Sequence, residues 1–351
     1  CLDHGTHPGS LVYAGYSAQP GWIATIPFQH FSQLIKQATG KPNASVRADS
    51  TTLFDRLAAA NAPIFQILPT LMARVEAVKE RDENYFVHEY LQENWRPLWH
   101  SETAGALRGA ELGYAAPATM ADSLMPRLLR PPLRELIEEQ PNHDLRGDVQ
   151  DLVVNQAFRR DIFCRQSGLA AAAGLERAGE TLLYLIPNLV PGNFVAFETS
   201  FGQVRLEWAN FAHIVAALSD GPKSVTELLA LPSHSDMTPQ QLLTLLLHAS
   251  ILGVGAPGAG DSAVSQRINS VIARAAADGA PYKDVAAAKL GSGIHVTESD
   301  LILLDAWLHT PSEDEAVFAK GISKRLPNAE ELAKTFVRET LPRYRQLGVL
   351  E

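Results

Sequence analysis

The sequence predicts a mainly α-helical protein with a minor β component, an α+β fold divided into several domains. Three observations lead to this prediction. Apolar residues recur at helical spacing through most of both halves, β-like runs are short and scattered, and a small Gly/Ala-rich segment separates the halves. The 351 residues are enough for two or three domains, each with its own core.

Residues 1–22 are predicted to open with a turn and one strand. Pro8 and Gly9 supply the turn, the strand runs on through Ser17, and Pro20–Trp22 makes a second turn. A single strand cannot pair its own backbone donors and acceptors. Since no strand precedes it in the sequence, we expect its partners in a sheet that lies upstream.

Residues 23–83 are predicted to form a helical region. Its apolar side chains recur every three or four residues, and Ser50 or Thr51 can cap the second helix. The third helix is expected to break or kink near Pro69. The predicted helices cover the stretch marked by Phe28, Phe31, Leu34 and Ile35, then residues 50–60 and 64–81.

Residues 84–166 are predicted to form the next domain. Gly113 would close its first helix as a C-terminal cap, and a short strand, a loop and a small helix should follow up to Met125. The predicted helices cover residues 103–112, 133–139 and 148–164. We interpret the Gly/Ala-rich residues 168–179 as a linker and place a domain boundary near Gln166.

The C-terminal half combines short strands with helices. One of its helices opens at Thr238, with a proline at the first helical position. Residues 180–255 have the order of elements typical of a winged-helix-like domain, and residues 262–351 predict a C-terminal helical domain. The predicted strands are 182–186, 194–199, 204–206 and 285–290, and the predicted helices are 212–219, 224–231, 238–252, 298–309, 314–326 and 329–347.

Composition and charge argue against several classes of partner. The formal net charge of −9 disfavours a large basic patch, and the predicted helix 238–252 has no Lys or Arg, so we expect no nucleic-acid partner. The apolar stretches are shorter than the about 20 residues that span a bilayer, so we expect no membrane insertion. The two cysteines, Cys1 and Cys164, cannot build a disulfide framework, which indicates a cytoplasmic location.

The run Gly253–Gly258 fits the dinucleotide-binding fingerprint GxGxxG. That motif requires a preceding strand and a helix whose N-terminus meets the pyrophosphate. Here a predicted Leu-rich helix precedes the run, and Pro257 lies inside it. We interpret the run as a linker, with a nucleotide site as the alternative.

The most unusual stretch sets His88, Glu89, His100 and Glu102 among large aromatic residues, although imidazole and carboxylate groups need partners when buried. A zinc-protease motif would require a second histidine four residues after His88, where Gln92 stands, so we expect no metal site. Two interpretations remain. The four residues are hydrogen-bonded at a domain interface, or they lie near a substrate, where they could take a proton from an amine or hydroxyl.

Two further features have structural and chemical interpretations. Cys164 ends a predicted apolar helix, where a buried thiol is inert packing rather than a nucleophile, and no GxSxG elbow occurs. The aromatic residues between positions 85 and 99 either pack in a core or form a cage for a cation such as methylated lysine.

An ordered series of short motifs spans residues 84–165: Tyr85–Leu91, Pro97–Glu102, Leu107–Tyr114, Met120 and Leu152–Arg160. This series resembles the methyltransferase regulatory domain that follows a class I S-adenosylmethionine-dependent methyltransferase domain in bacteria. Residues 8–17 and 20–22 are similar to the last strand of that methyltransferase domain and its exit. Ser10 and Ser17 stand where Gly and Asn are usual.

The resemblance implies that the chain is the C-terminal portion of such a methyltransferase. Residues 1–22 would be a remnant of its Rossmann-like sheet, 23–83 a helical linker or dimerisation region able to form a homodimer, and 84–166 the regulatory domain. The loop that binds the cofactor S-adenosylmethionine would lie upstream. This chain alone is therefore expected to bind no cofactor and to be inactive.

Some proteins of this architecture resemble protein lysine methyltransferases acting on bacterial surface proteins, so the resemblance implies a protein substrate docked by the C-terminal half. Methyl transfer depends largely on positioning and desolvation of the amine. The candidates for residues near the substrate are Tyr16, His88, Glu89, His100 and Glu102. The alternative is a non-catalytic protein-interaction module that regulates a separate methyltransferase.

Overall fold

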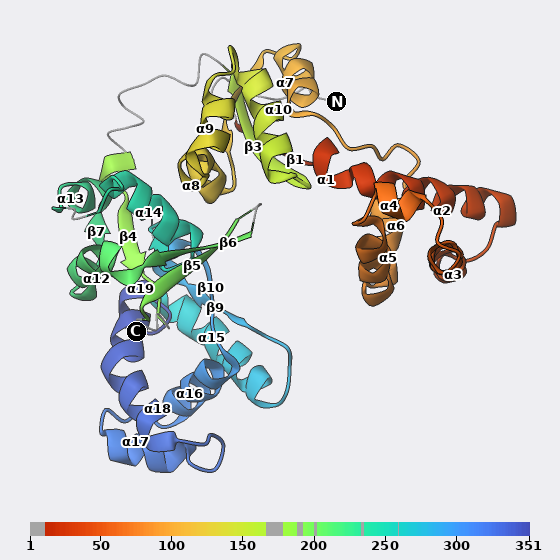
Figure 1. The fold of residues 1–351 in the computed structure, drawn as a ribbon. Coiled ribbons are helices and arrows are strands. Elements are labelled where there is room, and N and C mark those ends of the chain that lie inside the picture. Colours follow the sequence, from red (N-terminus) through yellow and green to blue (C-terminus); the bar gives the residue numbers. More distant parts are fainter. Residues whose placement is uncertain (1–10, 166–177, 188–191, 200–201, 233–234, 259) are drawn as a thin grey trace. The chain divides into compact units, whose positions relative to one another are not determined.

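The structure is a computed structural model that describes residues 11–165, 178–187, 192–199, 202–232, 235–258 and 260–351. The chain divides into two compact units, residues 1–169 with 200–202 and residues 170–199 with 203–351. Helices predominate and the sheets are small, which confirms the mainly α fold with a minor β component (Figure 1). The boundary predicted near Gln166 and most of the predicted linker lie outside the described residues.

The first unit begins with short helices around an aromatic core, and the helical region predicted over 23–83 is confirmed. Phe28, Phe54 and Phe86 are fully buried, and the rings of Phe28 and Phe54 meet edge-on with 5.2 Å between centroids. The predicted break near Pro69 falls between two helices. The helices are α1 (Gln19–Trp22), α2 (Ile26–Thr39), α3 (Asn43–Ala59), α4 (Ile64–Ile67), α5 (Leu71–Glu80) and α6 (Glu83–Tyr90).

The predicted cap at Ser50 or Thr51 is wrong. α3 begins at Asn43, and both residues are buried in its interior. Their hydroxyl groups donate to the carbonyl oxygens of Val46 and Arg47, one turn earlier, at 2.7 Å and 3.0 Å. Because Ser and Thr can bond back to the helix in this way, the residue type alone does not mark the helix start.

A three-stranded antiparallel sheet follows in the first unit, made of β1 (Leu11–Ser17), β2 (Leu112–Pro117) and β3 (Phe158–Arg165) in the order β1-β3-β2. β1 therefore has a partner within this chain, and the expectation that all its partners lie upstream is wrong. The pairing runs from Leu11 opposite Cys164 to Ser17 opposite Phe158. The remaining helices of this unit are α7 (His100–Arg108), α8 (Met125–Leu128), α9 (Pro131–Glu138) and α10 (His143–Val154), with a 3-10 turn at Met120–Leu124.

The long helix predicted over 148–164 is wrong in its second half. α10 ends where Asn155 adopts the left-handed conformation (φ 50°), and β3 follows. Phe158 and Arg160 are exposed whereas Arg159 and Asp161 are buried, which is the alternation of a strand. Since charged residues take two of the three inward positions and only Phe163 is apolar there, a search for alternating apolar residues does not detect this strand.

Gly113 and Cys164 also occupy different positions from those predicted. α7 already ends at Arg108, and Gly113 lies in β2, where it pairs with Cys164 of β3. The predicted C-cap and the placement of Cys164 at a helix end are therefore wrong. Cys164 is a buried residue of the sheet, 3% exposed.

The second unit contains the small sheet β7-β4-β8, the hairpin β5-β6, and a C-terminal set of helices with the hairpin β9-β10. Most predicted elements are confirmed here, but the helix predicted over 238–252 stops early and its last residue begins β8. The elements are β4 (Leu182–Leu185), β5 (Phe194–Thr199), β6 (Gly202–Glu207), α12 (Ala212–Ser219), β7 (Lys223–Ser224), α13 (Val225–Leu229), α14 (Pro239–His248), β8 (Leu252–Val254), α15 (Ser262–Ala277), β9 (Asp284–Ala287), β10 (Ser292–His295), α16 (Glu298–His309), α17 (Glu315–Ile322), α18 (Ala329–Thr335) and α19 (Leu341–Leu347).

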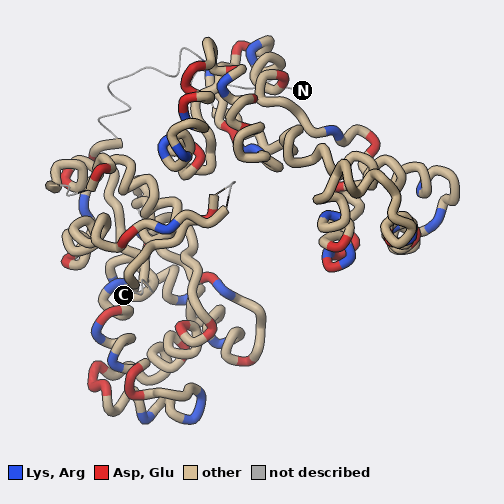
Figure 2. Tube along the Cα trace, viewed as in Figure 1, with Lys and Arg blue, Asp and Glu red and all other residues tan. Residues whose placement is uncertain are grey.

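The surface charges of both units are mixed. Lys and Arg residues are interspersed with Asp and Glu along each unit (Figure 2). Among the helices of the described residues, none has both the length and the apolar character required to cross a membrane.

Candidate functional site

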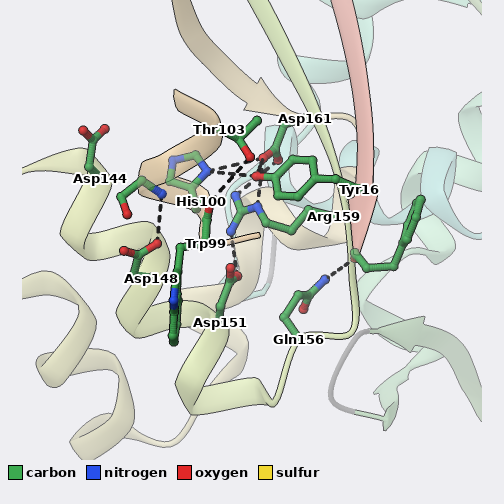
Figure 3. Close-up of polar contacts among 12 residues, drawn as sticks. Tyr16, Trp99, His100, Thr103, Asp144, Asp148, Asp151, Gln156, Arg159 and Asp161 are labelled. Carbon is green, nitrogen blue, oxygen red and sulfur yellow. Dashed lines mark hydrogen bonds and ion pairs between the residues drawn. The ribbon is translucent and has the colours of Figure 1, made fainter. Parts of the chain in front are cut away.

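The first unit contains a buried polar network centred on Asp161 (Figure 3). The Tyr16 hydroxyl donates to Oδ2 of Asp161 at 2.6 Å, and Nε of Arg159 donates to the same oxygen at 2.8 Å. Nη1 of Arg159 also donates to Oδ1 of Asp151 at 2.6 Å. Nδ1 of His100 lies 3.3 Å from Oδ2 of Asp161. The five side chains thus form one connected set.

Two strands and two helices bring these side chains together. Tyr16 lies opposite Arg159 in the pairing of β1 with β3. Arg159 and Asp161 are two residues apart on β3, so they point to the same face of the sheet. His100 begins α7, and Asp151 lies on α10. The network therefore joins β1 to the middle strand of the sheet and to two helices.

Burial and hydrogen bonding act in opposite directions on the two carboxylates. Burial raises the pKa of Asp151 to about 6, despite the opposing charge of Arg159. Burial also disfavours the charged form of Asp161, but hydrogen bonds from His100 and Arg159 outweigh it and hold the pKa of Asp161 below its usual value. Burial raises the pKa of Tyr16, so its hydroxyl remains a neutral donor.

The network has little room for a ligand. A cavity of about 10 Å³ touches Asp151, Arg159 and Asp161, which is the space of roughly one water molecule. Asp151 and Asp161 are each 1% exposed, and so is His100. In this geometry the network holds structural elements in register and has no space for a substrate side chain.

Two of the five predicted site residues, Tyr16 and His100, belong to this network. Glu102 instead caps α7, since its carboxylate accepts from the backbone N–H of Trp99 at 3.0 Å, and this bond lowers its pKa. His88 and Glu89 lie on α6, where His88 is exposed and Glu89 half-buried. Burial raises the pKa of Glu89.

Sequence reasoning missed Asp151, Arg159 and Asp161 because it placed them on one long helix. One sequence pattern could have indicated these residues. Arg159 and Asp161 are oppositely charged, lie two positions apart, and stand between the aromatic Phe158 and Phe163. On a strand such a pair shares one face and can neutralise itself when buried.

Metal and cage interpretations find no support in the geometry. Across the residues that the structure describes, no group of three or more His, Cys, Asp or Glu side chains is arranged to hold a metal ion. The aromatic rings of Tyr85, Phe86, Tyr90 and Trp95 lie in or against the helical core, and the rings of Phe86 and Tyr90 stack with 5.7 Å between centroids.

Two of the three glycines in the run Gly253–Gly258, Gly253 and Gly255, serve close packing. The run begins in β8, so the expectation that a helix directly precedes it is wrong. A Cβ on Gly253 would lie 2.7 Å from Leu290, and one on Gly255 would lie 3.0 Å from the carbonyl oxygen of Leu182. Asp261 then caps α15 with its own carboxylate, accepting from the N–H of Ala263 at 2.8 Å. This loop does not fit a nucleotide, because the space beside Gly253 and Gly255 is filled and the N-terminus of α15 already has the Asp261 carboxylate.

The comparisons with known proteins identify the class of the network-bearing segment. Residues 82–165 match the family described as a predicted methyltransferase regulatory domain, which confirms the resemblance expected from the sequence over this segment. The matched residues contain α7, β2, α10 and β3, and hence four of the five network side chains.

Relatives and solved structures extend the similarity to nearly the whole chain. The chain is 25% identical to an uncharacterized protein of Synechocystis sp., sll1526, over 366 aligned residues that cover 97% of this chain and 72% of the relative. It shares its fold with PKMT2 from Rickettsia typhi (TM-score 0.53, 13% identity, 98% of this chain and 75% of that one). The structure of PKMT2 in complex with AdoHcy gives a TM-score of 0.52 at 14% identity, covering 99% of this chain and 76% of that one.

Proposed function

We propose that this chain is the regulatory and substrate-docking part of an S-adenosylmethionine-dependent methyltransferase that modifies a protein, on a lysine amine. The observation that carries the proposal is the attachment of β1 to the regulatory domain. β1 lies outside the segment that matches the family, yet it pairs with β3 inside that segment along its whole length. Tyr16 of β1 completes the buried network with Asp161.

In this proposal β1 is a strand of the Rossmann-like methyltransferase sheet as well as of the regulatory domain. Among the described strands, β3 is the neighbour of β1 on one side, so the opposite edge of β1 can pair with that sheet. The cofactor would bind there, because the glycine-rich run of this chain does not fit it. The complex of PKMT2 with AdoHcy supports a cofactor of this chemistry for the complete protein.

The remaining parts of the chain take supporting roles in the proposal. Residues 23–83 would mediate a homodimer. The order α12-β7-α13-α14-β8 supports a winged-helix-like domain in the C-terminal half, which would dock the protein substrate in the cytoplasm. Of the candidates near the substrate, His88, Glu89 and Glu102 have solvent-accessible surface and could reach an amine, whereas Tyr16 and His100 would act by fixing β1.

The test compares the protein expressed from its complete gene with residues 1–351. Each is incubated with tritiated S-adenosylmethionine and lysine-containing protein, and tritium is counted in the precipitated protein. We expect transfer by the complete protein, no transfer by residues 1–351, and no heat when the cofactor is titrated into residues 1–351. If neither protein transfers tritium, the methyltransferase role is contradicted. Saturable cofactor binding by residues 1–351 contradicts the division of roles.

A second candidate function is a separate module that regulates another methyltransferase through protein contacts. It is favoured by the seven-residue pairing of β1 with β3, which satisfies one edge of β1 within this chain. In that case, adding residues 1–351 to an S-adenosylmethionine-dependent methyltransferase encoded by a neighbouring gene should change its rate of protein methylation. An unchanged rate would exclude that enzyme as the target.

A further inference from the structure

A pocket in the second unit gathers cationic side chains over a buried carboxylate. Its cavity of about 480 Å³ lies where the ends of α15 and α16 meet α17. Arg274, His309 and Arg325 line it together with the hydroxyl-bearing residues Thr310 and Ser312. Its size falls within the range of small-ligand sites in proteins, and several polar groups converge on it.

Asp305 holds the two arginines over this pocket. The residue is 5% exposed, and its carboxylate accepts from Nε of Arg274 at 3.2 Å and from Nη1 of Arg325 at 2.7 Å. Nδ1 of His309 donates to the carbonyl oxygen of Asp305 at 2.7 Å, and its other ring nitrogen contacts Nη2 of Arg274. These contacts fix both guanidinium groups in place.

The arginines still have N–H groups to offer. A guanidinium has five N–H donors. Asp305 engages one nitrogen of each arginine, and His309 engages a second nitrogen of Arg274, so each guanidinium keeps further donors for a ligand. The side chains of Arg274 and Arg325 remain 54% and 36% exposed, so a ligand in the pocket can reach them. A pair of arginines oriented in advance binds an oxyanion with little ordering cost.

The charges around the pocket and the residues that line it indicate which kind of anion it would bind. Arg274 and Arg325 carry two positive charges against one on the buried Asp305, while Asp278 at the rim is exposed and screened by water. The C-terminal ends of α15 and α16 add negative partial charge, which disfavours a phosphate dianion more than a carboxylate. Phe318 supplies an apolar wall for a short carbon stem.

We propose that this pocket binds a carboxylate on a short apolar stem, held between Arg274 and Arg325. Such a group occurs in an acidic side chain of a protein and in a free small carboxylic acid. The assignment to an acidic side chain of a protein substrate rests on the proposed docking role of this half. Binding of the carboxylate itself does not depend on methyl transfer.

Calorimetric titration of residues 1–351 tests the site without any cofactor. The probes are N-acetylated, C-amidated Ala-Glu-Ala, the same peptide with Gln in place of Glu, glutarate and inorganic phosphate. We expect saturable binding of the Glu peptide and none of the Gln peptide. If glutarate binds and the Glu peptide does not, the assignment to a protein side chain is overturned. If phosphate binds more tightly than the Glu peptide, the assignment to a carboxylate is overturned.

Matched variants test which residues form the site. Arg274→Gln and Arg325→Gln should each lower the affinity for the Glu peptide about tenfold or more. The control variant Arg267→Gln, whose residue lies on α15 but outside the pocket, should bind the peptide with the affinity of wild type. Arg325→Lys keeps the positive charge, so its affinity for the Glu peptide should lie between those of wild type and Arg325→Gln. Thermal melting checks that each variant folds. Equal affinity in all variants, or no binding by the wild-type protein, would overturn the proposal, whatever the outcome of the methyl-transfer assay.

Discussion

The replacement Gly147→Ala tests whether the ring of His100 is fixed against α10. A Cβ at Gly147 would lie 2.8 Å from Cγ and 3.0 Å from Nε2 of His100, and closer still to Cδ2. Alanine gains about 1 kcal/mol of helix propensity. Crowding of a packed interior costs about 1–3 kcal/mol, and moving the ring weakens its contact with Asp161, worth about 1 kcal/mol. We expect the free energy of unfolding to fall by about 1–3 kcal/mol.

The matched control is Gly105→Ala on α7, where an added Cβ would meet no atom within 4 Å. This variant should gain about 0.5–1 kcal/mol from reduced backbone freedom. Hydrogen exchange of β3 peptides in increasing urea measures the stability of the first unit separately from that of the second. If Gly147→Ala proves as stable as Gly105→Ala, the ring of His100 is not held against α10 and the reasoning is refuted.

Two further predictions concern the same network. Tyr16→Phe removes a donor 2.6 Å from a buried carboxylate and should cost about 1.5–3 kcal/mol in urea unfolding. The change Tyr13→Phe on the exposed part of β1 should cost less than about 0.5 kcal/mol, and equal losses would contradict the role of Tyr16. The pKa of Asp151 is raised from 3.8 to about 6, so its contribution to stability is full below about pH 4 and is lost as the pH rises through 6. The stability of wild type relative to Asp151→Asn should therefore fall by about 2–3 kcal/mol between pH 4 and pH 7, and a constant difference would show that the carboxyl does not titrate in this range.

The sequence predicts elements well where local signals decide them. The helix predicted over 298–309 is found with the same bounds as α16, because Thr297 and Asp300 exchange the hydrogen bonds of a capping box. The helix predicted over 212–219 is likewise found as α12. In both, the apolar face and the ends agree with the tertiary structure.

The sequence fails where tertiary contacts decide the structure. The sequence pattern does not predict β3, because two of its buried positions carry Arg159 and Asp161. These two residues can be buried only because Tyr16, His100 and Asp151 surround them. A local pattern cannot show partners that come from elsewhere in the chain. For the same reason His100 could be selected from its aromatic surroundings, but its partners could not.

The network ties β1 to the segment that matches the family model, residues 82–165. Separating β1 from β3 would break the backbone pairing and also remove the Tyr16 donor from Asp161, leaving a buried carboxylate short of one hydrogen bond. The second loss alone costs about 1–3 kcal/mol. We therefore expect β1 to move together with β3 and α10. In the proposed function β1 also belongs to the methyltransferase sheet, so the two domains share a strand. A displacement of α10 would then reach that sheet through Asp151, Arg159 and the pairing of β3 with β1, without a flexible hinge between the domains.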